Sequence, residues 1–307
     1  MERRRIGTLE VSVVGLGCNN FGWRIDKPAT HAVVAAALDA GINFLDTADM
    51  YGGGQSEEYL ADALRDRRKE IVLATKFGFS MGEGKSGASP AYVREAIDAS
   101  LSRLKTDYID LYQLHTPDPK TPIADTLGAL GELVKAGKVR EIGCSNFSAD
   151  QLREAAAAVK TGAPRFVSVQ NEYSLLNRAP EAEVLPECRR QGIAFIPYFP
   201  LANGLLTGKY RKGQPVPENS RGKDAWGPSV FTDSNLELVE SLYSFASSRG
   251  HSLLELAISW LATQEGIASV IAGAKTPQQA KANAAAASWN LSNEELAQID
   301  AIVLQTA

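Results

Sequence analysis

The sequence predicts an α/β fold, a (β/α)8 TIM barrel with an N-terminal β-hairpin cap and extra helices. Three observations support this prediction. Eight short runs rich in β-branched and apolar residues recur along the 307 residues, amphipathic stretches with helical periodicity alternate with them, and no linker or low-complexity tract divides the chain. Eight units favour a closed barrel over an open doubly wound sheet, although periodicity alone allows both. We therefore expect residues 1–307 to form a single domain.

The eight expected strands are all short. They span residues 13–17, 43–46, 71–76, 109–115, 141–145, 166–172, 194–198 and 269–272. Ahead of them, RRRIGTLEVS predicts a hairpin that turns near Gly7 and closes the bottom of the barrel. Residues 200–234 are rich in Gly, Pro and charge, and a loop of this length typically forms a lid or binds a ligand.

Several helix starts are marked by capping residues. A Ser or Thr precedes a Glu or Gln by three residues at Ser148, Ser252, Thr276 and Ser292, the pattern of a capping box. A proline follows Ser or Thr at Pro90, Pro122 and Pro277, where we expect it at the first helical position.

Composition excludes several classes of function. A net charge of −4 and a pI near 5.6 provide no basic surface for nucleic acid. No apolar run approaches the roughly 20 residues of a membrane span, and the N-terminus does not resemble a signal peptide, so we expect a cytoplasmic protein without a membrane partner. Cys18, Cys144 and Cys188 are too far apart for a disulfide framework, and we expect buried thiols and no metal site.

Polar residues stand at the carboxyl ends of six successive expected strands. They are Asp46, Lys76, His115, Ser145 with Asn146, Gln170 with Asn171, and Tyr198. A barrel gathers these ends at one mouth, where the active sites of this fold lie. Singly, each has a structural alternative: Asp46 and Lys76 as an ion pair, His115 as a core histidine, and Tyr51 in the loop YGGGQSEE as a packing residue.

Four of these residues have a joint chemical role in carbonyl reduction, which needs a proton donor. An ammonium near a tyrosine favours the tyrosinate, so Lys76 is expected to lower the pKa of Tyr51. Asp46 would hold Lys76 charged, and His115 would hydrogen-bond the carbonyl oxygen.

The segments DTADMYGGGQSEEYLADAL, VLATKFGF, YIDLYQLHTPD, REIGCSNF, VQNEYSLLNR and YFPLANGLLTGKY, followed by VIAGAKTPQQAKANAAA, resemble the aldo-keto reductases. The resemblance covers essentially the whole chain and is to the bacterial branch related to potassium-channel β subunits. It implies an NAD(P)H-dependent oxidoreductase whose catalytic tetrad is Asp46, Tyr51, Lys76 and His115.

The resemblance also implies a set of cofactor contacts. The nicotinamide carboxamide falls on Ser145, Asn146 and Gln170, and the stacking aromatic is Tyr198. Further contacts are expected from Cys18, Asn19, Asp46, Phe199, Pro200, Leu201, Ala202, Asn203, Lys209, Arg221, Gly273, Lys275, Gln279 and Asn283. Expected substrate contacts are Trp23, Tyr51, Phe77, His115 and Trp226.

Two departures from the family pattern bear on the choice of cofactor. Thr276 replaces an arginine often found near the 2′-phosphate, and Ala282 replaces an acidic residue. Lys209, Arg221 and Lys275 still supply positive charge, so NADP(H) is preferred, with NAD(H) as the alternative. Phe199 also replaces a serine, which removes a hydroxyl but keeps the backbone N–H.

The first functional hypothesis is an NADP(H)-dependent oxidoreductase that reduces aldehydes or ketones, with Tyr51 as general acid. The alternatives are an NAD-dependent dehydrogenase that oxidises sugar or pyridoxal-like alcohols, a cofactor-bound redox-sensing regulatory subunit, and a lyase or isomerase acting on phosphorylated substrates. The expected partner is a small carbonyl or alcohol substrate, and the expected state is a monomer or weak homo-oligomer.

Overall fold

The computed structural model describes residues 1–159, 163–218, 220–223 and 230–306. Eight parallel strands form one sheet in the order β10-β3-β4-β5-β6-β7-β8-β9. They are β3 (Val14–Gly17), β4 (Phe44–Asp46), β5 (Val72–Phe77), β6 (Ile109–Leu114), β7 (Val139–Ser145), β8 (Ser168–Glu172), β9 (Ala194–Tyr198) and β10 (Val270–Gly273). The eight expected strands are confirmed, each within two residues at either end.

The sheet curls into a nearly closed barrel. On one side, Val270 of β10 pairs with Val14 of β3. On the other, a parallel bridge joins Phe195 of β9 to Ile267, and the Ala268 amide donates a hydrogen bond of 2.9 Å to the Phe195 carbonyl. The ring of strands therefore continues across the gap between β9 and β10, as the barrel prediction requires.

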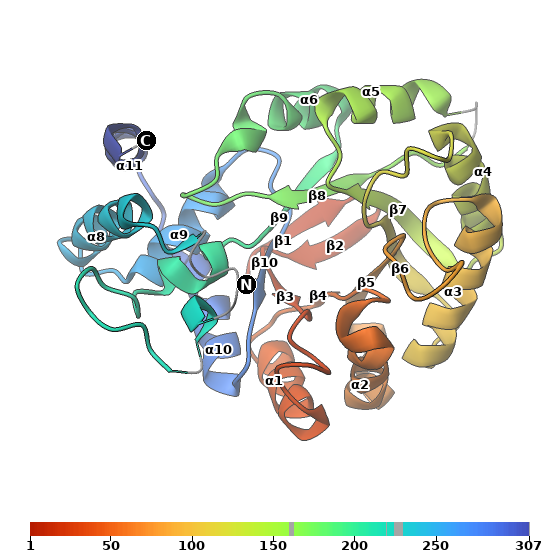
Figure 1. The fold of residues 1–307 in the computed structure, drawn as a ribbon, viewed down its shortest axis with the longest axis horizontal. Coiled ribbons are helices and arrows are strands. Elements are labelled where there is room, and N and C mark those ends of the chain that lie inside the picture. The colour runs from red at the N-terminus through yellow and green to blue at the C-terminus, as the bar shows by residue number, and fades with distance from the viewer. Residues whose placement is uncertain (160–162, 219, 224–229, 307) are drawn as a thin grey trace.

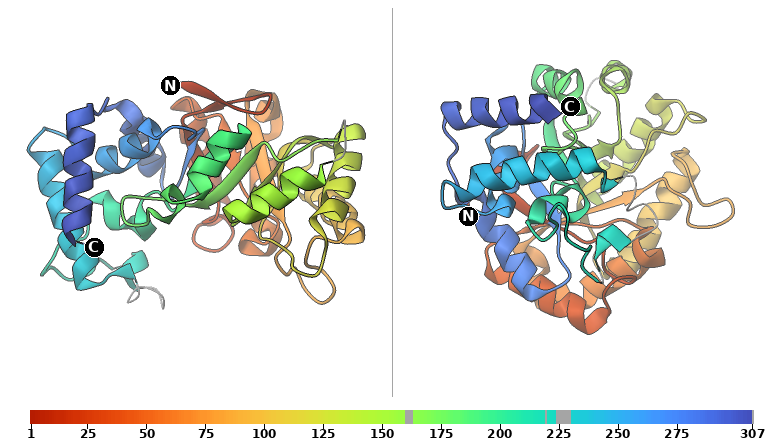
Figure 2. Two further views of the ribbon diagram at one scale, coloured as in Figure 1. Left: turned by 90° about the horizontal axis from the view of Figure 1, so that it is seen from above. Right: turned by 60° about the vertical axis from the view of Figure 1, so that its left-hand side comes forward.

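Helices surround the strands (Figure 1). Eight of them follow the strands in chain order: α1 (Lys27–Asp39), α2 (Gln55–Leu64), α3 (Pro90–Leu104), α4 (Ile123–Lys135), α5 (Ala149–Ala158), α6 (Val184–Gln191), α9 (Leu253–Thr263) and α10 (Pro277–Ala285). Within the described residues, two extra helices, α8 (Asp233–Ser247) and α11 (Asn293–Thr306), lie side by side at one side of the barrel (Figure 2).

Most helix starts follow the expected caps. Ser148, Ser252 and Ser292 each form the reciprocal pair of hydrogen bonds of a capping box. Thr276 forms only half of one, because the Gln279 side chain accepts from the Lys275 amide instead. The expectation for Pro122 was wrong by one residue: Pro122 is the N-cap of α4, and the helix begins at Ile123.

The N-terminal hairpin fills the lower end of the barrel. Strands β1 (Arg3–Ile6) and β2 (Leu9–Ser12) pair antiparallel around Gly7 and lie across the barrel opening (Figure 1). Their side chains join the inward-facing residues of the strands in one buried cluster: Ile6, Leu9, Val11, Phe44, Val72, Ala74, Leu111, Ile196, Ala268 and Ile271. The lower half of the barrel is therefore an apolar core, and the polar strand ends lie at the opposite opening.

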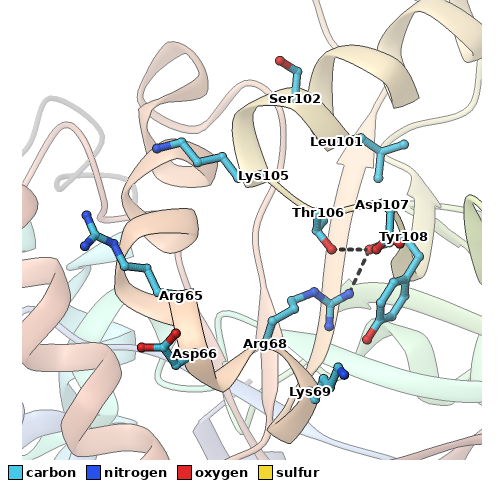
Figure 3. A pocket seen from close by; sticks show the side chains of 10 residues that line it. All are labelled: Arg65, Asp66, Arg68, Lys69, Leu101, Ser102, Lys105, Thr106, Asp107 and Tyr108. Carbon is cyan, nitrogen blue, oxygen red and sulfur yellow. Dashed lines mark hydrogen bonds between the residues drawn. The ribbon is translucent and has the colours of Figure 1, made fainter.

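An open cleft lies outside the barrel near the amino ends of β5 and β6 (Figure 3). It is lined by Arg65, Asp66, Arg68, Lys69, Leu101, Ser102, Lys105, Thr106, Asp107 and Tyr108. Arg68 pairs with Asp110 at 2.8 Å and donates to the Tyr108 carbonyl, so its charge is already compensated. The cleft shares no residue with the polar strand ends.

Candidate active site

Asp46 and Lys76 form a buried ion pair at the ends of β4 and β5. Lys76 Nζ lies 2.5 Å from Asp46 Oδ2 and donates to the Thr47 carbonyl at 2.8 Å. The other carboxylate oxygen, Asp46 Oδ1, accepts from the side-chain amides of Gln113 at 3.0 Å and Gln170 at 2.9 Å. Side chains from three strands thus hold the carboxylate of a fourth.

Gln113 was missed by the sequence reasoning, although a signal for it exists. It lies two residues before His115 and two after the apolar Leu111, and strand residues two apart face the same side of a sheet. A polar residue on the same face as a candidate active-site histidine points into the barrel mouth.

The charge of Lys76 is stabilised despite complete burial. Burial alone would lower its pKa, but the charge of Asp46 and the neighbouring Tyr51 raise it above the usual value. Lys76 is therefore an ammonium at neutral pH.

Tyr51 lies beside Lys76 at the start of the short helix η1 (Tyr51–Gly54). The Lys76 Nζ atom is 5.1 Å from the centroid of the Tyr51 ring. Gly52 has φ +59, and a Cβ there would come within 2.9 Å of the Phe21 carbonyl oxygen, so this turn needs glycine. The glycine-rich loop thereby brings the tyrosine to the mouth.

The pKa of Tyr51 corrects one expectation. Burial raises it above 10, and the opposing effect of Lys76 is smaller. The direction of the lysine effect is as expected, but the net shift is upward. Tyr51 is therefore a protonated phenol at neutral pH.

His115 follows β6 and contacts Tyr51 edge-on, with ring centroids 5.8 Å apart. Burial, and then the charge of Lys76, lower its pKa to about 2. Its Nδ1 atom is buried without a hydrogen-bond partner in the described part of the chain. The imidazole is neutral at pH 7 and can donate or accept one hydrogen bond without carrying charge.

The rim of the mouth differs from the expectation at Phe77. Its side chain is 0% exposed and stacks on Tyr112 with ring centroids 4.7 Å apart, so it lies in the core and cannot contact a substrate. Phe79 lies at the mouth instead: it is 37% exposed, and its ring centroid is 4.5 Å from that of His115. Trp226 lies outside the described residues.

Three large apolar side chains are exposed around this part of the chain. Trp23 is 63% exposed, Met50 is 39% exposed, and Phe79 has already been described. Met50 adjoins Tyr51 in sequence, and Trp23 donates its indole N–H to the Asn19 carbonyl at 2.7 Å. Sequence reasoning identified Trp23 but missed Met50 and Phe79.

The ends of β7, β8 and β9 carry a second hydrogen-bonded group. The Ser145 hydroxyl donates to the Gln170 carbonyl at 2.7 Å, and the Tyr198 hydroxyl donates to Asn146 Oδ1 at 2.9 Å. Asn146 also donates to the His115 carbonyl at 2.9 Å, which links this group to the Asp46 side of the mouth. Asn171 instead donates to the Phe147 carbonyl.

The loop after β9 has an unusual backbone. Phe199, Ala202 and Asn203 have φ values of +50, +44 and +58. Such values are costly for residues with a Cβ and cluster at ligand-binding segments. Pro200 and Leu201 lie between them, and Ala202 and Asn203 begin the short helix η4 (Ala202–Thr207).

The last strand and helix complete this side of the mouth. Gly273 ends β10, and a Cβ there would come within 3.0 Å of Asn20 Nδ2 and 3.3 Å of Asn19 Oδ1. The side chain of Asn283 donates back to the Gly273 carbonyl at 3.3 Å. Lys275 and Gln279 lie at the start of α10, whose first amides provide a partial positive charge.

Three further residues were expected to contact the cofactor, namely Cys18, Lys209 and Arg221. The Cys18 amide donates to the Asp46 carbonyl at 2.9 Å, while its thiol is buried with a pKa well above the usual value because of desolvation. Lys209 is exposed, with Nζ 4.9 Å from the Tyr210 ring centroid. Arg221 begins the short helix η5 (Arg221–Lys223), and its side chain lies outside the described part.

The polar donors and acceptors of this mouth fit a nicotinamide dinucleotide. Amide and hydroxyl groups at β7 and β8 suit a carboxamide, Tyr198 offers a flat ring, and the α10 N-terminus suits phosphate. Within the described residues, no group of three or more His, Cys, Asp or Glu is placed to hold a metal ion. No helix in the same residues combines the length and apolarity needed to cross a membrane.

Comparison with known proteins identifies the family. The sequence model described as "Aldo/keto reductase family" matches residues 13–304. The chain belongs to the aldo-keto reductases. This family consists of oxidoreductases that use NAD(P)H.

Individual relatives cover nearly the full length of this aldo-keto reductase. It is 36% identical to "Aldo-keto reductase yakc [NADP(+)]" of Schizosaccharomyces pombe, over 96% of this chain and 89% of the relative. It is also 36% identical to a probable voltage-gated potassium channel subunit beta of Oryza sativa, over 91% of this chain and 89% of that one. The glycerol dehydrogenase AKR11B4 from Gluconobacter oxydans superposes with a TM-score of 0.86 at 29% identity, over 99% of this chain and 96% of that chain.

Proposed function

We propose that this aldo-keto reductase reduces aldehydes or ketones to alcohols with NADP(H), using Tyr51 as the general acid. The observation that carries the proposal is the buried Asp46–Lys76 pair beside a protonated Tyr51 and a neutral His115. We further propose that the whole chain acts as one domain.

Each of the four side chains has a separate role in protonating the carbonyl oxygen. When bound, the cofactor supplies hydride to the carbonyl carbon. The developing alkoxide takes a proton from the Tyr51 hydroxyl, and the ammonium of Lys76 stabilises the tyrosinate that remains. Asp46 keeps Lys76 charged and oriented, and His115 donates a hydrogen bond to the same carbonyl oxygen without adding charge.

The cofactor would be held on the β7 to β10 side of the mouth. Ser145, Asn146 and Gln170 would bind the carboxamide, and Tyr198 would stack on the nicotinamide ring. The strained loop from Phe199 to Asn203, together with Gly273 and the α10 N-terminus, would hold the phosphates, and Asn283 would bind near the adenine. Lys209, Lys275 and Arg221 are the expected cations for a 2′-phosphate.

The substrate would be a carbonyl compound with an apolar or aromatic part. Trp23, Met50 and Phe79 present apolar surface close to Tyr51 and His115. Burying that surface against an apolar group is favourable. The Arg24 guanidinium lies 4.2 Å from the Trp23 ring centroid, so a cation also borders this surface.

The proposal is tested with Tyr51→Phe and parallel fluorescence titrations with NADPH and NADH. We expect turnover to fall by about 10²–10⁴-fold, the usual contribution of general acid catalysis, with unchanged NADPH affinity. Undiminished turnover would remove Tyr51 from the mechanism. Tighter binding of NADPH than NADH in the wild type, lost in a Lys209→Ala/Lys275→Ala double variant, supports the cofactor choice.

A second candidate function is an NAD-dependent dehydrogenase acting on alcohols. It is favoured by Thr276, whose hydroxyl caps α10 rather than offering a cation, and by the structural similarity to a protein named as a glycerol dehydrogenase. Equal or tighter binding of NADH in the same titration would favour it, and alcohols and sugars would then be screened for oxidation.

A further inference from the structure

Asp49 is a buried carboxyl group that the proposed mechanism does not use. It lies two residues before Tyr51 in the loop after β4, and its side chain is 1% exposed. Its amide donates to the Lys76 carbonyl at 3.0 Å, which ties this loop to β5. Within the described part of the chain, neither carboxyl oxygen makes a hydrogen bond of ordinary geometry.

The cations that act on Asp49 are committed to other carboxylates. Arg103 of α3 donates to Glu57 Oε2 at 2.6 Å, while the Thr75 hydroxyl donates to Glu57 Oε1 at 2.6 Å. Lys76 is paired with Asp46. An ionised Asp49 would therefore be a buried charge without a partner, which is strongly unfavourable.

The groups facing Asp49 come from four elements. Glu57 lies on α2, Lys76 on β5, Arg103 and Tyr92 on α3, and Tyr112 on β6. Tyr112 is also fully buried, and its hydroxyl has no partner within the described residues. Burial and then the Glu57 charge raise the pKa of Asp49 to about 7, against the weaker effects of the Met50 amide, Arg103 and Lys76.

We propose that Asp49 is a positioning residue that holds the Tyr51 loop in place as a neutral carboxylic acid, close to the Glu57 side chain that is paired with Arg103. The proposal rests on the proposed role of Tyr51. When Asp49 loses its proton, two carboxylates face each other in a buried space, and the loop can relieve the repulsion only by moving Asp49 toward water. Tyr51 is then drawn away from Lys76, and reduction slows as the pH rises.

The pH range of this effect separates Asp49 from its neighbours at the mouth. The pKa values of Tyr51 and Lys76 are raised above 10, and that of His115 is lowered to about 2. A fall in kcat/KM near pH 7 would thus arise from Asp49 and from none of these three groups.

Protonation is tested first, without catalysis, by infrared difference spectroscopy of the intact protein across pH 5–9. We expect a carbonyl band of a buried carboxylic acid that disappears around pH 7 and is missing from Asp49→Asn. The exposed Glu58, one residue from Glu57, gives a matched control, and Glu58→Gln should keep the band. A wild-type protein without this band at pH 6 would overturn the proposal.

Positioning is tested by the pH profile of reduction. We expect wild-type kcat/KM to fall about tenfold per pH unit above the pKa of Asp49, as for a single proton, and Asp49→Asn to be flat because an amide mimics the neutral acid. Glu57→Gln, which removes the neighbouring charge and keeps one of the two acceptor oxygens, should move the fall to lower pH. A fall at unchanged pH in both variants would contradict the role of Asp49.

The two tests fail independently. If Tyr51→Phe keeps full turnover, the proposed function is wrong while the infrared result for Asp49 still stands. If Tyr51→Phe is inactive but the infrared band is absent, only the role of Asp49 is wrong.

Discussion

The two ends of the barrel interior have opposite chemistry although the same strands build both. At the lower end, Ile6, Leu9 and Val11 of the hairpin pack on apolar strand residues in one buried cluster. At the upper end, Asp46, Lys76, Gln113 and Gln170 form a hydrogen-bonded group. The N-terminal hairpin covers the lower end, and the loops that follow the strands surround the upper end. The lower end thus contributes mainly to the stability of the fold. The upper end provides the groups proposed for catalysis, and burying those polar and charged groups costs stability.

The largest effect should follow from removing the cation of the upper end. Lys76→Met leaves Asp46 buried without its partner, so we expect a loss of about 3–5 kcal/mol in the free energy of unfolding. Reduction should fall below detection because Tyr51 loses the charge that stabilises its anion. Chemical denaturation and steady-state assays measure both, and a fully active Lys76→Met would mean that the pair is only structural.

A substitution at the lower end should affect stability alone. Leu9→Ala opens a cavity against the strands, and we expect a loss of about 2–5 kcal/mol in the free energy of unfolding. The kcat of the folded fraction should match the wild type, since Leu9 belongs to the apolar cluster at the other end. A large change in kcat would show that the two ends are coupled.

The neutral His115 links the upper end to pH. Its pKa is lowered from 6.5 to about 2 in the folded protein. Below pH 6.5 the imidazole is therefore protonated in the unfolded chain but stays neutral in the folded protein. The free energy of unfolding falls as the pH drops through this range. Between pH 7.5 and 5.5 we expect this to cost about 1.4 kcal/mol. The measurement is the difference between wild type and His115→Asn at both pH values, because the comparison cancels other groups, Asp49 included. Equal pH dependence would show that folding does not lower the pKa of His115.

The smallest effect should come from the rim of the upper end. Tyr198→Phe removes one hydrogen bond to Asn146 but keeps the ring, so we expect about 0.5–1.5 kcal/mol in stability and less than a tenfold change in cofactor affinity. Tyr198→Ala removes the ring as well and should weaken cofactor binding further. Equal affinities in the two variants would argue against ring stacking.

Much of this contrast could be predicted from the sequence. Polar residues at the carboxyl ends of apolar strands must lie at the same opening of the barrel, because all the parallel strands end there. Phe77 shows the limit of that reasoning. It adjoins Lys76, and neighbouring strand residues face opposite sides of the sheet, so the alternation that directs Lys76 to the mouth directs Phe77 to the helices. Phe79 lies beyond the strand, where no periodicity applies.

Asp49 was beyond reach for a different reason. Nothing in DTADMYG distinguishes an exposed aspartate from a buried one, because its environment is formed by α2, α3 and β6. The pKa of Tyr51 is similar: the sequence indicates the lysine beside it, but the larger effect of burial depends on how the whole mouth closes.

The N-terminal hairpin also constrains the order of events during synthesis. Residues 3–12 are translated before every strand of the barrel, yet their contacts include Ala268 and Ile271, and Arg4 donates hydrogen bonds to the carbonyls of Ala262 and Ile267. The apolar side chains of the hairpin therefore cannot be fully buried until β10 and the residues just before it have been translated. Such contacts between distant parts of a chain slow folding and leave apolar surface exposed meanwhile. The nascent hairpin is accordingly a segment whose apolar side chains a chaperone could protect until the barrel closes.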